Sequence, residues 1–293
     1  MTTRPAPHVV INELVAGIRM LASLPTVVTR VVAVLDDPRA TTQQIVEVVQ
    51  QDTAFAAHIL RVANSAFFGA SQRIDSLSKA ITFLGTMQIR NLALGLAVAQ
   101  SFQGIPNTLL SMRTFWNHSI LCAICARLLA MEALDARPET AFVGGLLHDV
   151  GKLVLAILAP DAARLALLEA TADPLRRPLY LCERDVLGFD HAEVGGALAK
   201  RWLLPASLVA AVEFHHDPER AAPRSYEASV VHVANGLAHL VEAQSLNPED
   251  APPMAAFAWQ RLGLTADVIP RVVPAAREAV AEVKHLFNLV LTR

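Results

Sequence analysis

Histidine recurs in four short segments through the middle of the chain, and each segment lies on or beside a predicted helix. The segments are residues 116–119, 147–149, 189–191 and 214–217. Imidazole nitrogens and carboxylate oxygens are common donors to hydrolytic metal ions, so the pattern indicates a metal cradle. A fifth segment, residues 231–235, ends on Asn235 where this layout calls for a closing carboxylate. A neutral amide oxygen is a poorer ligand for a hard cation, which moves the interpretation from an enzyme toward a sensor or scaffold.

His148 and Asp149 are neighbours at the end of a predicted helix. Their side chains diverge from one backbone point, so together they can give a neutral nitrogen and an anionic oxygen to one ion. Lys152 follows three residues later, where a cation facing a phosphate would be useful. A single histidine between packed helices more often ties them together by hydrogen bonds, without any ion. Both interpretations stay open at this point.

Helices must position these side chains, and the first hundred residues already consist of short helices without strands. Thr41 with Gln44 forms a capping-box pattern, Asp52 and Ser76 are N-cap candidates, and Gly85 is a helix terminator. The apolar residues between these signals recur at three- and four-residue spacing, which predicts a compact helical bundle.

The histidine-bearing half continues with longer helices. A helix over about residues 108–133 carries His118, and a helix beginning at Pro138 reaches His148. A last amphipathic helix is expected from Pro274 onward, and its apolar stripe must pack on this chain or on another subunit. The predicted fold class is therefore all-α.

Composition limits the possible functions. The chain has 293 residues, 53% hydrophobic and 18% charged, and a formal net charge of −2. No basic patch is present for nucleic acid, and the charge-free run over residues 91–112 is interrupted by polar residues and a proline, so we expect neither a nucleic-acid partner nor a membrane span. Three cysteines and no signal peptide predict a cytoplasmic location, with Cys122 and Cys125 as small core residues.

Residues 144–152 resemble the signature of the HD superfamily of metal-dependent phosphohydrolases. Together with four other segments they resemble the HDOD family of bacterial signalling proteins, over about residues 24–240. The other segments are residues 63–69, 80–85, 183–195 and 213–218. The resemblance implies a two-lobed, all-helical module, with an N-terminal helical bundle packed on an HD-like helical domain, that serves as a regulatory output or scaffold domain.

The resemblance also assigns domains and candidate residues. We expect an N-terminal tail over residues 1–20, a bundle lobe over 21–105, an HD-like lobe over 106–245 and a C-terminal extension over 246–293. By comparison with HD-GYP hydrolases, a divalent metal (iron, manganese or magnesium) would be held by candidates from four segments, with Lys152 contacting phosphate and Lys152 or His216 as the catalytic candidates. The metal-ligand candidates are His118, His148, Asp149, His191 and His215.

Two departures argue against catalysis. The Gly-Tyr-Pro string that follows the paired histidines in HD-GYP enzymes is replaced here by residues 217–220, and Asn235 stands in place of the final aspartate. His232 lies nearly one helical turn before Asn235, so it cannot take over that role without a shift of several ångströms in the metal.

The leading hypothesis is a bacterial signal-transduction protein that acts through partner or ligand binding, with a degenerate HD-type metal and phosphate pocket. The expected partners are regulatory proteins, with a nucleotide second messenger and a homodimer as further possibilities. The alternatives are an active metal-dependent phosphohydrolase and a nucleotide sensor that binds without hydrolysis.

Overall fold

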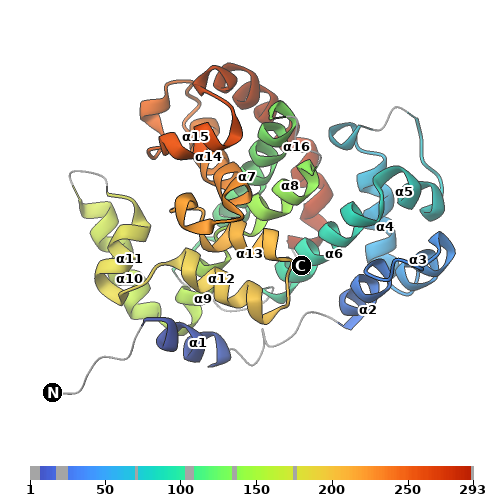
Figure 1. Cartoon of the computed structure of the whole chain (residues 1–293), viewed down its shortest axis with the longest axis horizontal. Helices are drawn as coiled ribbons and strands as arrows, with labels where there is room; N and C mark the ends of the chain where they lie inside the picture. Colours follow the sequence, from blue (N-terminus) through green and yellow to red (C-terminus); the bar gives the residue numbers. More distant parts are fainter. Residues whose placement is uncertain are drawn as a thin grey trace. The chain divides into compact units, whose positions relative to one another are not determined.

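The computed structural model describes residues 7–17, 26–69, 72–102, 109–133, 137–173 and 177–291. These residues form helices and no strands, which confirms the all-α fold class (Figure 1). The chain divides into two compact units. We call residues 1–22 and 105–277 the histidine unit, and residues 23–104 and 278–293 the N-terminal bundle.

The N-terminal bundle consists of short helices. They are α2 (Thr26–Leu35), α3 (Thr42–Val49), α4 (Thr53–Ala63), the 3₁₀ turn η2 (Ala66–Phe68), α5 (Leu77–Leu84), α6 (Thr86–Ser101) and the last part of α16 (Ile269–Leu291).

The start and stop signals of the sequence act as predicted in this bundle. Thr41 and Gln44 form the capping box of α3, and the Asp52 carboxylate accepts hydrogen bonds from two backbone N–H groups of α4. Ser76 caps α5, which ends at Gly85 in a positive-φ conformation. The next helix, α6, begins at Thr86.

Two polar residues of the bundle have structural partners. The Asn64 side chain donates to the Leu60 and Ile74 carbonyls and accepts from the Ile74 N–H. The Ser65 hydroxyl donates to Glu282 of α16 at 2.6 Å. These bonds fix the chain after α4, as polar side chains near a helix C-terminus commonly do.

The histidine unit contains the remaining helices. They are α1 (Pro7–Gly17), α7 (Met112–Glu132), α8 (Pro138–Leu147), α9 (Val150–Leu158), α10 (Pro160–Ala172), α11 (Leu179–Leu187), α12 (His191–Arg201), α13 (Ala206–Glu213), η3 (Pro218–Ala221), α14 (Ser225–Glu242), η4 (Pro248–Asp250), α15 (Ala256–Leu262), η5 (Ala266–Val268) and the first part of α16.

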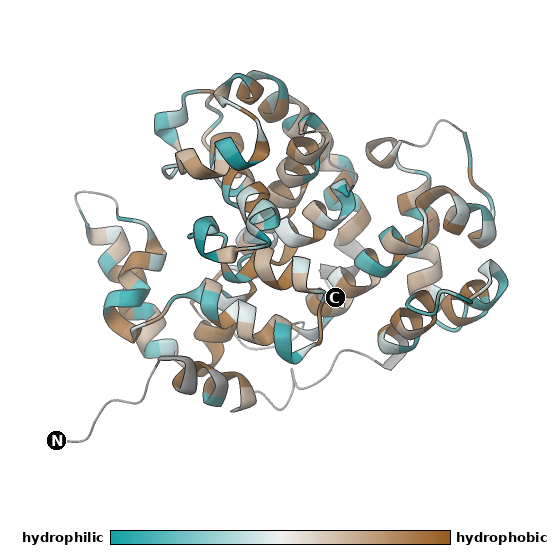
Figure 2. Ribbon diagram, in the orientation of Figure 1, coloured by the Kyte–Doolittle hydropathy of each residue, from teal (hydrophilic) through white to brown (hydrophobic). Residues whose placement is uncertain are grey.

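The core of the histidine unit is built around α7, which packs against α8 and α14, while α12 packs against α9 and α13. Figure 2 shows the hydrophobic stretches along these helices. Cys122 and Cys125 lie fully buried and free in α7, which confirms them as core residues. Burial raises the pKa of both thiols and keeps them protonated.

Two segments of this unit, α7 and Pro138–Leu158, are long and apolar enough to cross a membrane by length and composition. In the structure 72% and 78% of their most apolar 18-residue windows are buried inside the protein. Their apolar surface thus contributes to the core.

Glycines allow the helices that carry the site to approach closely. A Cβ at Gly145 of α8 would lie 2.8 Å from the Cys122 carbonyl oxygen and from Ala123 Cα of α7. A Cβ at Gly151 of α9 would collide with the His191 carbonyl oxygen at the start of α12. The glycines therefore bring α7, α9 and α12 near the His148–Asp149 pair.

The two ends of the chain differ from the expected boundaries. The segment expected to be a tail contains α1, which packs on α9 and α12 because Ile11 and Val15 form a buried stripe. The C-terminal segment is divided between the two units at residue 277. Its long helix begins at Ile269 and not at Pro274, since the buried apolar residues of its first turns hold the helix on both sides of the proline.

Candidate metal centre

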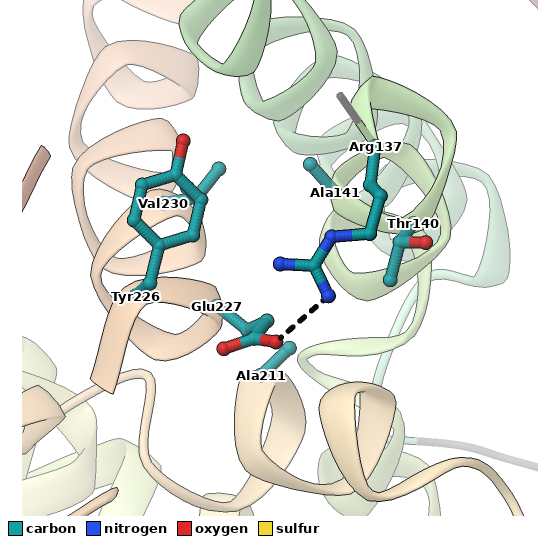
Figure 3. A pocket seen from close by; sticks show the side chains of 7 residues that line it. All are labelled: Arg137, Thr140, Ala141, Ala211, Tyr226, Glu227 and Val230. Atoms are coloured by element: carbon teal, nitrogen blue, oxygen red, sulfur yellow. Dashed lines mark ion pairs between the residues drawn. The ribbon is translucent and has the colours of Figure 1, made fainter. Parts of the chain in front are cut away.

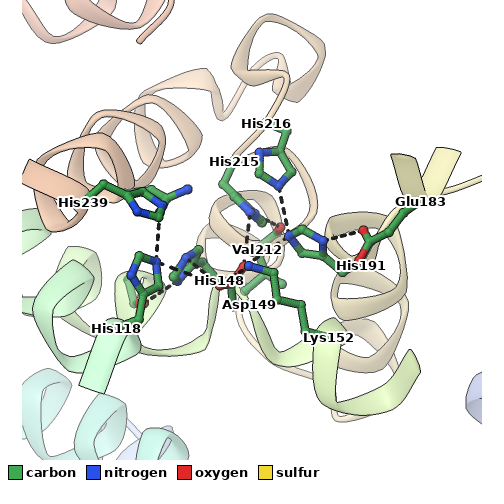
Figure 4. Close-up of polar contacts among 12 residues, drawn as sticks. His118, His148, Asp149, Lys152, Glu183, His191, Val212, His215, His216 and His239 are labelled. Atoms are coloured by element: carbon green, nitrogen blue, oxygen red, sulfur yellow. Dashed lines mark hydrogen bonds and ion pairs between the residues drawn. The ribbon is translucent and has the colours of Figure 1, made fainter. Parts of the chain in front are cut away.

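The candidate site lies within the histidine unit and takes its side chains from separate elements (Figure 4). His118 projects from the middle of α7, and His191 is the first residue of α12. His148 ends α8 and Asp149 begins α9, so the break between these helices carries the adjacent pair. His215 and His216 follow the end of α13. The structure thus brings together residues that are up to about a hundred positions apart in the sequence.

Three of the histidines are oriented in the same way, by a hydrogen bond at Nδ1. His148 donates to the Gly145 carbonyl at 2.7 Å, and His215 donates to the Val212 carbonyl at 2.8 Å. His191 Nδ1 faces the Glu183 carboxylate at 2.5 Å. A donor bond at Nδ1 leaves the other ring nitrogen, Nε2, for a ligand, which is the usual arrangement of metal-binding histidines.

The three Nε2 atoms surround the carboxylate of Asp149. Asp149 Oδ2 lies 3.4 Å from His148 Nε2, and Oδ1 lies 3.1 Å from His191 Nε2 and 3.8 Å from His215 Nε2. The side chains of all four residues are almost fully buried. Lys152 Nζ donates to Asp149 Oδ2 at 2.6 Å, and the Lys152 side chain is partly exposed.

Among the described residues, His148 Nε2, His215 Nε2 and Asp149 Oδ1 are buried and make no hydrogen bond. The short approach of Asp149 Oδ1 to His191 Nε2 falls outside hydrogen-bond geometry. Leaving such atoms unsatisfied costs about 1–3 kcal/mol each. A divalent cation would satisfy such atoms, and the donor atoms that lie within 4.8 Å of one another form two groups in this region, His118 with His148 and Asp149, and His191 with His215 and His216. The residues present therefore fit a metal ion.

The protonation states of these groups suit a cation only in part. Burial lowers the pKa of His148 to about 3 and that of His215 well below its usual value, so both rings are neutral. Burial opposes ionisation of Asp149, but His148, Lys152 and His191 outweigh it and hold its pKa well below the usual range. Burial also lowers the pKa of His191, yet Glu183 and Asp149 raise it to about 9. A metal ion would have to displace that proton.

His118 is engaged differently from the other candidates. Its Nε2 lies 3.0 Å from Asn235 Oδ1, and its Nδ1 lies 3.1 Å from Glu242 Oε1. Asp149 Oδ2 is 4.0 Å from His118 Nε2. Asn235 thus occupies the ring nitrogen of His118 that faces the buried cluster.

The two remaining histidines of the region have other neighbours. His216 Nε2 lies 3.0 Å from His191 Nε2, and its ring stacks on Tyr180 with centroids 4.0 Å apart. His232 donates from Nδ1 to the His215 carbonyl and accepts from the Ala255 N–H at Nε2. With both nitrogens occupied, His232 is a structural residue that supports His215.

Sequence reasoning gave no role to three residues of this region. Glu183 orients His191 from α11, eight positions earlier, through both the ring and the backbone N–H. His239 and Glu242 follow Asn235 on α14, at a spacing that places all three on one helix face. The helical spacing from Asn235 was the available signal for the last two, whereas nothing in the sequence pairs Glu183 with His191.

A second pocket of the histidine unit shares no residue with the histidine cluster. Figure 3 shows its lining by residues of α8, α13 and α14 and the residue before α8, with Arg137 and Glu227 forming an ion pair at 3.5 Å. The paired charges leave this pocket without an arrangement that indicates chemistry.

A family model described as the HDOD domain matches residues 21–218. The chain is 27% identical over 217 residues to an uncharacterized protein of Treponema pallidum. The matched region covers 73% of this chain and 41% of that protein. It is also 35% identical over 105 residues to ribonuclease Y of Thermus thermophilus, covering 36% of this chain and 13% of that protein. The chain therefore spans less than half the length of these relatives.

Solved structures share the fold. An HDOD domain protein of unknown function from Geobacter sulfurreducens superposes with a TM-score of 0.75 at 24% identity, over 96% of this chain and 98% of that chain. A candidate phosphohydrolase from Shewanella amazonensis has a TM-score of 0.69 at 25% identity, over 90% and 93% of the two chains. A candidate signal transduction protein from Marinobacter aquaeolei has the same TM-score at 22% identity, over 92% and 59%.

Proposed function

Because the chain belongs to the HDOD domain family, we propose that it is a cytoplasmic bacterial signalling protein that acts by binding, with an HD-type pocket that holds a metal ion but has lost part of its catalytic ligand set. The observation that carries this proposal is the pairing of Asn235 Oδ1 with His118 Nε2. An amide stands where the layout calls for a carboxylate, and its oxygen contacts the ring nitrogen of His118 that lies nearest Asp149.

The inner metal site, as we define it, consists of His148, Asp149, His191 and His215. Three imidazoles and one carboxylate suit iron or manganese better than magnesium, which prefers oxygen ligands and keeps several waters. A bound divalent ion would supply positive charge for phosphate oxygens at this position.

The surrounding residues prepare this site for binding. Gly145, Val212 and Glu183 hold the three rings with Nε2 toward Asp149. Lys152 balances the charge of Asp149 and extends toward solvent, where its ammonium can contact a phosphate group of a ligand. The ligand class that fits is therefore a phosphate-bearing molecule such as a nucleotide second messenger, and the output is the binding of a regulatory protein partner.

A second candidate function is phosphoester hydrolysis at the same pocket. The unsatisfied ligand atoms of His148, Asp149 and His215 favour it, since a metal ion in this pocket would need such donors. The similarity to a candidate phosphohydrolase also supports this alternative. Catalysis would further require an open metal position for water.

Turnover separates the two functions. The purified protein would be loaded with manganese or iron and assayed with nucleotides, cyclic dinucleotides and generic phosphoesters, beside calorimetry with the same compounds. We expect ligand binding without turnover, and loss of metal in His148→Ala. The control is His285→Ala, which removes an exposed histidine of the N-terminal bundle. Turnover that is present in the wild type and in His285→Ala but absent in His148→Ala would overturn the binding proposal and establish the hydrolase.

A further inference from the structure

A second group of metal-ligating side chains lies beyond Asn235, outside the inner metal site. It consists of His118 on α7 with His239 and Glu242 on α14. Figure 4 shows the two histidines. Asn235, His239 and Glu242 are spaced by four and three residues, so they share one face of α14. Their donor atoms, one from each of His118, His239 and Glu242, lie within 4.8 Å of one another.

The distances in this group match the spacing of ligands around one ion. His118 Nδ1 lies 3.1 Å from Glu242 Oε1, and His239 Nδ1 lies 3.4 Å from Glu242 Oε2. The rings of His118 and His239 have centroids 4.7 Å apart. Zinc binds imidazole nitrogen and carboxylate oxygen at about 2.0–2.1 Å in a tetrahedron, which places neighbouring ligand atoms about 3.3–3.4 Å apart.

Asn235 selects the nitrogen that His118 offers to this group. A neutral imidazole has one N–H and one lone pair. When Nε2–H donates to Asn235 Oδ1, the lone pair of Nδ1 faces the Glu242 carboxylate at 3.1 Å. Two acceptors at that distance need a proton or a cation between them.

Charge and exposure also suit a cation. Glu242 supplies the carboxylate oxygen of the group. The side chains of His239 and Glu242 are 39% and 36% exposed, whereas that of His118 is 12% exposed. An ion can therefore enter from solvent and keep water as a further ligand.

We propose that His118, His239 and Glu242 form a second divalent-metal site of the zinc class, the outer site, which shares no ligand with the inner metal site. Two imidazoles and one carboxylate are donors that zinc accepts, and three protein ligands leave one position for water or for a donor of a bound molecule. The inference goes beyond the proposed function, because it assigns His118 to a different ion and gives roles to His239 and Glu242.

Metal titration of the whole chain tests the outer site. Protein stripped by a chelator would be titrated with Zn²⁺ alone, with bound metal counted by mass spectrometry and affinities measured by calorimetry. Co²⁺ would serve as a spectroscopic probe, since its visible absorption reports the coordination of each ion. We expect two ions in the wild type and one ion in His239→Asn and in Glu242→Gln. Removing a group that hydrogen-bonds to a metal ligand alters metal affinity by about 10–100-fold, so loss of a ligand itself should weaken the outer site by at least about 100-fold.

Three further variants make the result decisive. His148→Ala should lose the inner ion and keep the outer one, and His118→Ala should lose only the outer ion. The control is His285→Asn, because His285 is an exposed histidine outside both sites, and this variant should keep both ions. The outer site is overturned if the wild type binds no second ion, or if Glu242→Gln and His239→Asn retain both ions with unchanged affinity. It is also overturned if His118→Ala abolishes the inner ion alone, because His118 would then belong to the inner set.

Discussion

At the residue scale, the side-chain amide of Asn235 distinguishes His118 from the other histidines. Asn235 Oδ1 contacts His118 Nε2, whereas the Nε2 atoms of His148, His191 and His215 lie near the Asp149 carboxylate. The histidine that differs from the others is the one with Asn235 as its neighbour. A substitution at position 235 should therefore change metal binding directly.

Asn235→Asp is expected to raise the affinity of the inner metal site for Mn²⁺ by at least about 10-fold. An anionic oxygen replaces a neutral amide in a partly desolvated pocket, and it restores the carboxylate that the layout calls for. The measurement is calorimetry in a Glu242→Gln background, so that the outer site does not contribute. Unchanged affinity together with a lower free energy of unfolding would instead identify Asn235 as a hydrogen-bonding group only.

His58 of the N-terminal bundle should make stability depend on pH. Burial, followed by the nearby Arg61, lowers its pKa to about 3, and its ring packs edge-on against Phe287 of α16. Its pKa of about 3 in the folded chain lies below the ordinary histidine value of 6.5, so the unfolded chain binds more protons between these two pH values. The free energy of unfolding should therefore fall as the pH drops from about 6.5 toward 3, by at most about 1.4 kcal/mol per pH unit from this residue.

Urea unfolding of wild type and His58→Leu across this pH range measures that contribution. Carboxylates titrate in both proteins, so the difference between the two curves isolates His58. We expect the free energy of unfolding of the wild type to fall relative to that of His58→Leu as the pH falls, because the variant lacks the group that gains a proton on unfolding. Parallel curves would show that His58 keeps an ordinary pKa in the fold.

At the element scale, the site depends on the close contact of α9 with α12. Gly151 lies against the His191 carbonyl and Gly195. The helix junction at His148 and Asp149 therefore stands next to the first turn of α12, which carries His191.

Gly151→Ala should separate these helices and weaken both stability and metal binding. The added methyl group has no space, and such overpacking costs about 1–3 kcal/mol. We expect a lower free energy of unfolding and a weaker inner metal site, since His191 must move away from Asp149. The control is Gly17→Ala at the end of α1, where nothing lies within 4 Å of the added Cβ. Normal Mn²⁺ affinity in Gly151→Ala would mean that the position of α12 does not set the site.

At the scale of the whole molecule, α16 contributes to both compact units. Its first turns belong to the histidine unit, and its residues from Glu278 onward belong to the N-terminal bundle. Within the bundle, Glu282 accepts hydrogen bonds from the Ser65 hydroxyl and the Ala66 N–H. This carboxylate holds the turn after α4.

Glu282→Ala is expected to loosen the bundle and leave the inner metal site unchanged. Loss of hydrogen bonds to a charged acceptor costs about 1.5–3 kcal/mol, while the metal ligands belong to the other unit. Hydrogen exchange at residues 65–68 should become faster, with Glu282→Gln intermediate because it keeps an acceptor. If Glu282→Ala also weakened Mn²⁺ binding, the expectation that this change affects only the N-terminal bundle would be wrong.

The sequence by itself determined the helical class and many helix ends. Thr41, Asp52 and Ser76 cap the helices that their positions predict, because capping involves groups only two or three residues apart. The family resemblance was also visible in local strings, and the family match confirms it. The helix at Ile269–Leu291 was misplaced at its start, since buried apolar packing outweighs the usual signal of a proline.

Only the tertiary structure decided which partner each histidine has. His118 meets Glu242 across 124 positions and Asn235 across 117, contacts set by the packing of α7 against α14. The resemblance named His118 beside the other ligand candidates, but it could not show that Asn235 contacts one of its ring nitrogens while Glu242 contacts the other. Local hydrogen bonds can be inferred from neighbours in the chain, whereas a buried polar cluster depends on the angle and distance at which whole helices meet.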